Sequence, residues 1–321
     1  MRQAGRNIMR RAQDALRHAQ AADRHLGAFE SWISHIRVAP ASSSPGLLEG
    51  WTCGVKDNID VANLPSRAGS DAFPSSAVKE DSTLASRVRA AGAVILGKTR
   101  MHELAAGATG YQERAGPAPR NPWDATLAPG GSSSGSAVAT SAGLVRFALG
   151  TDTGGSVRIP AAWNGVVGLK LSAGAVPLDG VLPLAPSLDS VGVLARSVRD
   201  AALVRDALLG RRAPGETTRR LLRSAGGPAG DLTGGGANDA GGGSGASGEE
   251  VSLAGVSVGL LPDHELGAGA LCTGGRAAYE RSVAQLAGLG ARMVPLQLPC
   301  GLEEMRRRAM LTIRFEAYAR R

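Results

Sequence analysis

Three short segments of the chain hold residue types that could catalyse a reaction. They are GVKDNID at 54–60, GGSSSGSA at 130–137 and GTDTGGSVRIP at 150–160. Neither glycine-rich loop has the GKS or GKT ending of a phosphate-binding loop. Glycine also leaves backbone N–H groups unobstructed, so several of them can point at one oxygen. At the start of a helix such groups bind an anion, and the candidates are Thr153, Gly154, Gly155 and Ser156.

This pattern predicts an oxyanion hole with the Ser156 hydroxyl at its end. A serine hydroxyl needs a base before it can attack a carbonyl. Among five histidines only His102, in KTRMHEL on a predicted helix, could serve, and a structural hydrogen bond is its alternative role. A lysine serves when burial keeps it neutral. Lys56 follows Gly54 and Val55 on a predicted buried strand and is one of only four lysines, although a surface lysine paired with Asp57 is the alternative interpretation.

Composition narrows the class of protein. The 321 residues are 43% apolar, which is enough for a buried core, and the net charge is +8. The basic residues are mostly arginines spread along the chain, and aromatic residues make up 3%, so a nucleic-acid-binding surface is not indicated. No apolar run approaches the roughly 18 to 20 residues of a membrane span. The basic N-terminus lacks the apolar core of a secretory signal and predicts a surface helix, with an organelle-targeting helix as the alternative.

The number and spacing of the cysteines indicate the redox state of the compartment in which the protein is found. Cys53, Cys272 and Cys300 form no CxxC pair and no even set. They therefore predict a reducing cytoplasm and neither a disulfide framework nor a zinc site.

Helices and strands alternate along the first two thirds of the chain, which predicts an α/β fold. Helices are expected near 5–23, after a cap at Asp81 or Ser82, near Met101, and from the capping box of Ser197 and Asp200 to Gly210. Strands are expected around Val55 and at 93–97, FALGT and 166–172. Later expectations are a strand at VSVGLLP, a helix near 276–288, a strand at RMVPLQLP and a helix from about 302 to the last residue.

One segment departs from this alternation. Eleven of the 23 residues at 226–248 are glycine, which predicts a flexible insertion within a single domain spanning 1–321. The chain also ends inside its last predicted helix, which we interpret as a chain cut short.

In this order the three segments resemble the signature of the amidase signature family of serine amidohydrolases. The run GGSSSGSAVATSAGLVRFALGTDTGGSVRIPAAWNGVVGLK resembles that signature almost without interruption, and GKTRMHELAAGATG, RNPWD and PSLDSVGVLARSVRDAAL agree. The resemblance covers roughly residues 5 to 210 well and the rest weakly. It implies a mixed central sheet flanked by helices on both faces, incomplete here at the C-terminus.

The resemblance implies a Ser–Ser–Lys triad. Ser156 matches the nucleophile, Ser132 matches the bridging serine that follows a cis peptide bond, and Lys56 matches the lysine base. The surrounding residues expected to brace the loop or donate hydrogen bonds are Ser133, Asp152 and Arg158. No metal or organic cofactor has a role in this chemistry.

The expected function is hydrolysis of a carboxamide C–N bond to a carboxylate and ammonia or an amine. The segments AAWNG and LDGVLPLAPSLDS favour a stand-alone hydrolase of small linear amides. The alternatives are the glutamine-hydrolysing subunit of a tRNA-dependent amidotransferase and an inactive, truncated remnant. The expected partner is a small amide, without nucleic acid or membrane, and with a homodimer as a possible assembly. The chain expressed alone is expected to self-associate and to show little activity.

Overall fold

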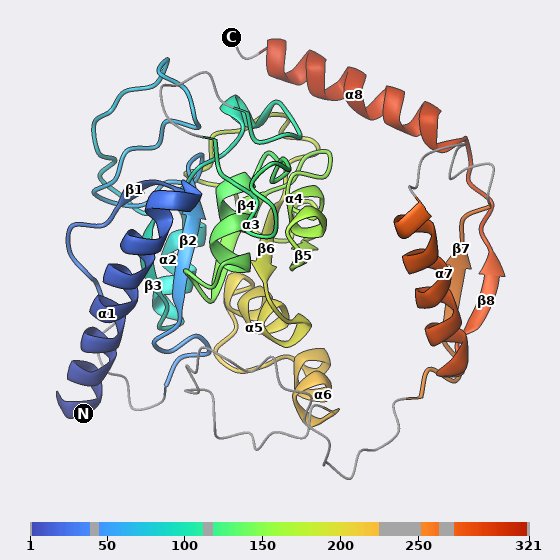
Figure 1. Ribbon diagram of the computed structural model, residues 1–321, viewed down its shortest axis with the longest axis horizontal. Helices are drawn as coiled ribbons and strands as arrows, with labels where there is room; N and C mark the ends of the chain where they lie inside the picture. Colours follow the sequence, from blue (N-terminus) through green and yellow to red (C-terminus); the bar gives the residue numbers. More distant parts are fainter. Residues whose placement is uncertain (1, 39–44, 112–117, 225–251, 263–272, 320–321) are drawn as a thin grey trace. The chain divides into compact units, whose positions relative to one another are not determined.

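The computed structural model describes residues 2–38, 45–111, 118–224, 252–262 and 273–319 (Figure 1). The contacts divide the chain into two compact units. The first holds α1 to α6 and a six-stranded sheet, and the second holds β7, α7, β8 and α8 up to Phe315. The glycine-rich segment 226–248 lies outside the described residues. A single domain spanning 1–321 therefore stays a prediction.

The first unit is built on one mixed sheet, as expected. Its strands run in the order β1 (Phe29–Trp32), β3 (Val94–Thr99), β2 (Thr52–Lys56), β4 (Phe147–Thr151), β6 (Val191–Ala195) and β5 (Val167–Lys170). β2 is parallel to β3 and to β4, whereas the pairs β1–β3, β4–β6 and β5–β6 are antiparallel. The four strands expected in this unit are present. β1 and β6 were not predicted, and both are short, at four and five residues.

Helices cover both faces of this sheet, which confirms the expected layering (Figure 1). α1 (Arg2–Leu26) and α3 (Ser134–Ser141) pack on one face, and α2 (Thr83–Ala90) and α5 (Val198–Leu208) pack on the other. The core on the α1 side includes Ala12, Ala19, Leu96, Val138 and Ala148. The core on the α2 side includes Val55, Leu84, Phe147, Val193 and Leu203. Burial of these apolar side chains is the main contribution that holds the layers together.

The expected caps are present at α2 and α5. The Ser82 hydroxyl accepts a hydrogen bond from the Ala85 N–H at 3.2 Å, and the Ser197 hydroxyl accepts one from the Asp200 N–H at 3.1 Å. The Asp200 carboxylate does not complete a capping box, because it binds the Arg146 guanidinium at 3.0 and 3.2 Å. Each cap satisfies one of the free N–H groups of a first helical turn.

The helix predicted near Met101 is wrong. Only the 3-10 turn η1 (Glu103–Ala105) forms there. Leu104 and Ala105 have positive φ angles of 53° and 59°, a left-handed conformation that stops an α-helix. Tertiary bonds offset this cost: the Leu104 N–H donates to the Ala68 carbonyl at 2.8 Å, and the His102 N–H donates to the Ser132 carbonyl at 2.9 Å.

Four elements follow the glycine-rich segment, as expected. They are β7 (Ser257–Leu260), α7 (Thr273–Gly288), β8 (Arg292–Pro295) and α8 (Leu302–Tyr318), and β7 pairs parallel with β8. The short helix α6 (Glu216–Ser224) of the first unit was not predicted. Cys53 and Cys300 are free thiols, and Cys272 lies outside the described residues. Within the described ranges no helix has the length and apolarity needed to cross a membrane.

Candidate active site

Two neighbouring parallel strands end at the candidate site. Lys56 is the last residue of β2, and Thr151 is the last residue of β4. The carboxyl ends of parallel strands meet at one edge of a sheet, where open α/β sheets commonly hold their ligands. β2 lies between β3 and β4, so Lys56 is completely buried although it is a lysine.

The predicted triad residues Lys56 and Ser132 are in direct contact. The Lys56 Nζ lies 2.7 Å from the Ser132 Oγ, and both side chains are fully buried. Ser132 follows a cis peptide bond with Gly131, as the resemblance implied. A Cβ at Gly131 would lie 2.8 Å from the backbone nitrogen of Gly110, so this position requires glycine. The serine-rich turn is thus held between Lys56 and the 107–110 loop, directly before α3.

Burial changes the ionisation of Lys56. Its Nζ also donates to the Thr151 hydroxyl at 2.8 Å and to the Thr151 carbonyl at 3.3 Å. Desolvation lowers the pKa of Lys56 to about 7, although the nearby carboxylates of Asp152 and Asp189 favour its charged form. A large fraction of the side chain is therefore neutral near neutral pH, as a general base requires.

Asp152 organises the loop between β4 and α4 (Arg158–Trp163). Its buried carboxylate accepts hydrogen bonds from the N–H groups of Gly155 at 2.7 Å and Val157 at 3.0 Å. The Arg158 guanidinium binds both carboxylate oxygens, at 2.9 and 3.1 Å. Burial opposes ionisation of Asp152, but Arg158 and the backbone donors outweigh it and lower its pKa. The predicted role of Asp152 and Arg158 in bracing this loop fits this geometry.

The same geometry corrects one of the four predicted oxyanion donors. The Gly155 N–H already donates to Asp152 and is not available to a substrate oxygen. In the described part of the chain the N–H groups of Thr153, Gly154 and Ser156 donate no hydrogen bond, so these three are the remaining candidates. The sequence pattern could not show which of the four N–H groups is free, because it does not reveal which of them donates to the Asp152 carboxylate.

Ser156 and Ser133 meet through the backbone. The Ser133 N–H donates to the Ser156 carbonyl at 3.1 Å, and the Ser133 hydroxyl donates to the Thr151 carbonyl at 3.3 Å. Ser156 is half-buried, and its hydroxyl makes no hydrogen bond within the described residues. The structure therefore brings the predicted nucleophile beside the serine-rich turn and leaves its hydroxyl unengaged.

Three polar residues of the site were missed as site residues by the sequence analysis. Thr151 holds Lys56, and the Asn58 Nδ2 donates to the Thr151 hydroxyl at 3.2 Å and to the Leu182 carbonyl at 3.2 Å. Asp189 accepts the Thr153 hydroxyl and the N–H groups of Leu184 and Ala185. Asn58 and Asp189 lie in the motifs VKDN and PSLDS, but motif membership alone did not indicate their contacts.

A small cavity of about 10 Å³ adjoins these residues. Asn58, Thr151, Thr153 and Asp189 line its polar side. Its apolar side is formed by Leu178, Val181, Leu182 and Leu184. Thr151 and Thr153, in the loop that carries the candidate oxyanion donors, thus face leucine and valine side chains.

His102 contacts the site through its backbone. Its N–H donates to the Ser132 carbonyl at 2.9 Å, whereas its ring Nδ1 lies 3.5 Å from the Thr109 hydroxyl. Burial lowers the pKa of His102, and the neighbouring Glu103 partly opposes this. The backbone contact agrees with the alternative, structural role considered for this residue.

A second buried lysine supports the chain that follows Lys56. The Lys98 Nζ lies 3.4 Å from the Asp57 carboxylate and donates to the Pro65 carbonyl at 3.0 Å and the Ser66 hydroxyl at 2.9 Å. Asp57 therefore pairs with Lys98, and Lys56 is not the surface partner of Asp57. In the described ranges no group of three or more histidine, cysteine or acidic side chains is arranged to hold a metal ion.

Comparison with known proteins identifies the family of this chain. The family model described as Amidase matches residues 10–319. The chain belongs to the amidase family. Membership supports an amide-cleaving enzyme and agrees with the mixed sheet and its helices.

Relatives in the amidase family include a glutamyl-tRNA(Gln) amidotransferase subunit from Symbiobacterium thermophilum, which is 41% identical over 254 residues. That match covers 79% of this chain and 48% of the relative. The protein of the same name from Burkholderia pseudomallei is 37% identical over 307 residues, or 90% of this chain and 57% of the relative. The chain thus spans about half the length of the curated relatives it matches.

Solved structures also support membership of the amidase family. A peptide amidase in complex with the competitive inhibitor chymostatin superposes with a TM-score of 0.76 at 31% identity, covering 97% of this chain and 63% of that one. The corresponding glutamyl-tRNA(Gln) amidotransferase subunit from Thermotoga maritima gives a TM-score of 0.72 at 29% identity, covering 97% and 68%.

Proposed function

We propose that this amidase-family chain hydrolyses the C–N bond of a carboxamide through an acyl-enzyme on Ser156, with Ser132 and Lys56 as a proton relay. The observation that carries the proposal is the 2.7 Å contact between the Lys56 Nζ and the Ser132 Oγ in a fully buried site. A lysine whose pKa is about 7 can accept a proton from a serine that it touches.

Acylation then proceeds in balanced steps. The Ser132 proton passes to the Lys56 Nζ, Ser132 takes the proton of Ser156, and the Ser156 Oγ bonds to the amide carbon. The carbonyl electron pair moves to the oxygen, where the N–H groups of Thr153, Gly154 and Ser156 stabilise it. When the C–N bond breaks, the relay returns the proton to the leaving nitrogen. Ammonia or an amine departs and the acyl group stays on Ser156.

Deacylation uses the same groups in reverse. Water loses a proton to the relay as its oxygen attacks the acyl carbon, and the Ser156 Oγ leaves with the returned proton. The products are a carboxylate and the free enzyme. The Asp152–Arg158 pair keeps the donor loop in place during both steps, because the Asp152 carboxylate, held by Arg158, accepts hydrogen bonds from the backbone N–H groups of Gly155 and Val157.

The substrate class that we propose is a small linear carboxamide. The leucine and valine side chains beside Thr151 and Thr153 favour an apolar acyl group over a charged one, and the cavity among them, at about 10 Å³, would have to widen to admit it. We expect ammonia release from small aliphatic or aromatic amides. A fluorophosphonate probe, which labels only an activated serine, should modify Ser156, and peptide mass mapping would locate the label. Labelling at another serine, or none in a protein that releases ammonia, would contradict the assignment.

Hydrolysis of glutamine is the second candidate. It is favoured by the names of the relatives, since several are called subunits of glutamyl-tRNA(Gln) amidotransferase. Those names point to an assembly that involves tRNA, whereas the sequence predicts no nucleic-acid partner. The absence of a nucleic-acid partner stays a prediction, and so do the cytoplasmic location and the homodimer. Ammonia release compared between glutamine and a panel of small carboxamides separates the two candidates.

A further inference from the structure

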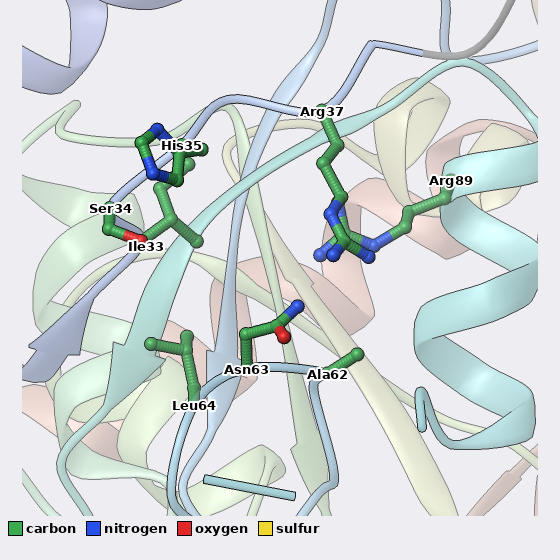
Figure 2. A pocket seen from close by; sticks show the side chains of 8 residues that line it. All are labelled: Ile33, Ser34, His35, Arg37, Ala62, Asn63, Leu64 and Arg89. Atoms are coloured by element: carbon green, nitrogen blue, oxygen red, sulfur yellow. The ribbon is translucent and has the colours of Figure 1, made fainter. Parts of the chain in front are cut away.

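A second pocket lies in the first unit and shares no residue with the candidate active site. Its volume is about 210 Å³. It is formed by the chain after β1, the loop after β2 and the last turn of α2 (Figure 2). The residues that line it are Ile33, Ser34, His35, Arg37, Ala62, Asn63, Leu64 and Arg89.

Positive charge gathers on one side of this pocket. Figure 2 shows the side chains of Arg37, from the segment after β1, and Arg89, from α2, reaching into the pocket, with the Asn63 amide directed towards them. The Arg89 Nε lies 3.0 Å from one oxygen of Asp81, whose other oxygen accepts the Ala62 N–H at 2.8 Å. Arg37 makes no ion pair with any described residue. Asp81 thus pairs with Arg89, and Arg37 adds a positive charge to the pocket without an ion-pair partner among the described residues.

The opposite side of the pocket combines the apolar side chains of Ile33 and Leu64 with Ser34 and His35 (Figure 2). Ile33 and Leu64 are buried, and the Ile33 N–H donates to the Leu96 carbonyl of β3 at 3.0 Å. The Asn63 N–H donates to the Val78 carbonyl at 2.9 Å, and the Val78 N–H donates to the Leu64 carbonyl at 3.0 Å. These hydrogen bonds fix the backbone on this side of the pocket at Ile33, Asn63 and Leu64.

This combination indicates the chemistry of a ligand. Two guanidinium groups that share a pocket repel each other, and an anion between them replaces that repulsion with charge-assisted hydrogen bonds. Inorganic phosphate would satisfy the guanidinium groups but would leave uncovered the small part of Ile33 and Leu64 that is exposed in the pocket. A carboxylic acid with a short apolar body meets both sides.

We propose that this pocket is a binding site for a small organic carboxylate. The carboxylate group lies between Arg37 and Arg89, and the apolar body packs on Ile33 and Leu64. The proposal is independent of the proposed catalytic function, because the two sites share no residue.

The test is calorimetric titration of residues 1–321 with sodium benzoate, with benzyl alcohol as a neutral probe of similar size and with inorganic phosphate. We expect benzoate to bind more tightly than either of the other two. Arg37→Gln should weaken benzoate binding by about tenfold or more, since hydrogen bonds to charged groups are the stronger ones. Arg37→Lys should retain part of the affinity because it keeps the charge. Arg10→Gln, at an exposed position of α1, is the control with the same change in net charge.

Methyl NMR locates the ligand without relying on charge. Benzoate should shift the methyl signals of Ile33 and Leu64 in the wild-type chain and not in the Arg37→Gln variant. Equal benzoate affinity in wild type and Arg37→Gln would overturn the site, and so would an equal loss in Arg10→Gln. Binding of phosphate without binding of benzoate would overturn the carboxylate assignment.

Discussion

Thr151 accepts two hydrogen bonds from Lys56, one on its hydroxyl at 2.8 Å and one on its carbonyl at 3.3 Å. A neutral amine has two N–H bonds and one lone pair. When both N–H groups of Lys56 are held by Thr151, the lone pair is left for the Ser132 hydroxyl at 2.7 Å. Thr151 thus aims the candidate base, and Asn58 holds the Thr151 hydroxyl in turn at 3.2 Å.

Replacement of Thr151 by valine tests this relationship. Valine keeps the volume and the carbonyl but removes one acceptor from a buried amine. We expect kcat/KM for amide hydrolysis to fall by about tenfold to a hundredfold, since an unsatisfied buried polar group costs about 1–3 kcal/mol. Thr151→Ser, which keeps the hydroxyl, is the matched control and should stay within a few fold of wild type. A larger loss in Thr151→Ser than in Thr151→Val would show that the methyl group, and not the hydroxyl, matters.

The pH dependence of activity follows from the pKa of Lys56. Burial lowers that pKa to about 7, and only the neutral amine can accept a proton. The fraction of neutral Lys56 therefore rises as the pH rises through 7. We expect kcat/KM to increase up to about pH 8 and then to level off. A profile that keeps rising towards pH 10 would indicate a lysine with an ordinary pKa and would contradict the burial argument.

Asp189 offers a second test of the same pKa. Its carboxylate favours the charged form of Lys56, so its removal should lower the pKa of Lys56 further. Asp189→Asn should then move the rising limb of the pH profile to lower pH. Asp179→Asn, at an exposed position nearby in the sequence, serves as the control and should leave the limb in place. A shift of the limb to higher pH in Asp189→Asn would reverse the sign and refute the assignment.

Sequence patterns predicted the strands that end at Lys56 and Thr151 because these strands are buried, apolar and bounded by polar turns. They did not predict β1 and β6, although β4 and β5 are equally short and were predicted, because short strands of this length do not give a reliable pattern. The failed helix at Met101 has a different cause. Left-handed backbone at Leu104 and Ala105 is supported by distant partners, Ala68 among them, which no local propensity reveals.

The candidate active site likewise contains some residues that a sequence motif identifies and others that only contacts between distant segments identify. The triad positions were named through a long family-like motif, whereas Thr151, Asn58 and Asp189 act through contacts between segments far apart in the chain. The Gly155 donor was assigned incorrectly because Asp152, only three residues earlier, takes its N–H. The sequence of the loop predicts that backbone N–H donors are present. Only the folded structure shows which of these N–H groups are not already hydrogen-bonded.

The buried pair of Lys98 and Asp57 should dominate the response of stability to mutation near the site. Both side chains are buried, and Lys98 also holds the Pro65 carbonyl and the Ser66 hydroxyl. Lys98→Met leaves the Asp57 carboxylate buried without its cation, which costs about 3–5 kcal/mol in comparable cases. Lys79→Met, at an exposed lysine, should change the free energy of unfolding by about 0.5 kcal/mol or less. Urea unfolding of the two variants and wild type measures the difference, and similar stabilities would contradict the pairing.

Variants of Lys56 and His102 separate the two candidate bases. Lys56→Met removes the amine that touches Ser132, so we expect loss of nearly all amidase activity. His102→Ala keeps the backbone N–H that binds the Ser132 carbonyl and should retain most activity. The ammonia-release assay is run at several pH values, so that a shifted optimum is not mistaken for loss. An inactive His102 variant beside an active Lys56 variant would exchange the two roles.

Ser156→Ala is the most direct test of the nucleophile. Within the described residues the Ser156 hydroxyl makes no hydrogen bond, so its removal should leave the fold and the thermal midpoint unchanged. Amide hydrolysis should fall by about a thousandfold or more, because a catalytic nucleophile contributes at least that much to kcat. The fluorophosphonate label should disappear with it. Ser172→Ala, at an exposed loop position, controls for loss of an unrelated hydroxyl and should keep both activity and label. Residual turnover above about a thousandth of wild type, with the label retained, would identify another serine as the nucleophile, and Ser132 would be the first to test because it touches the lysine.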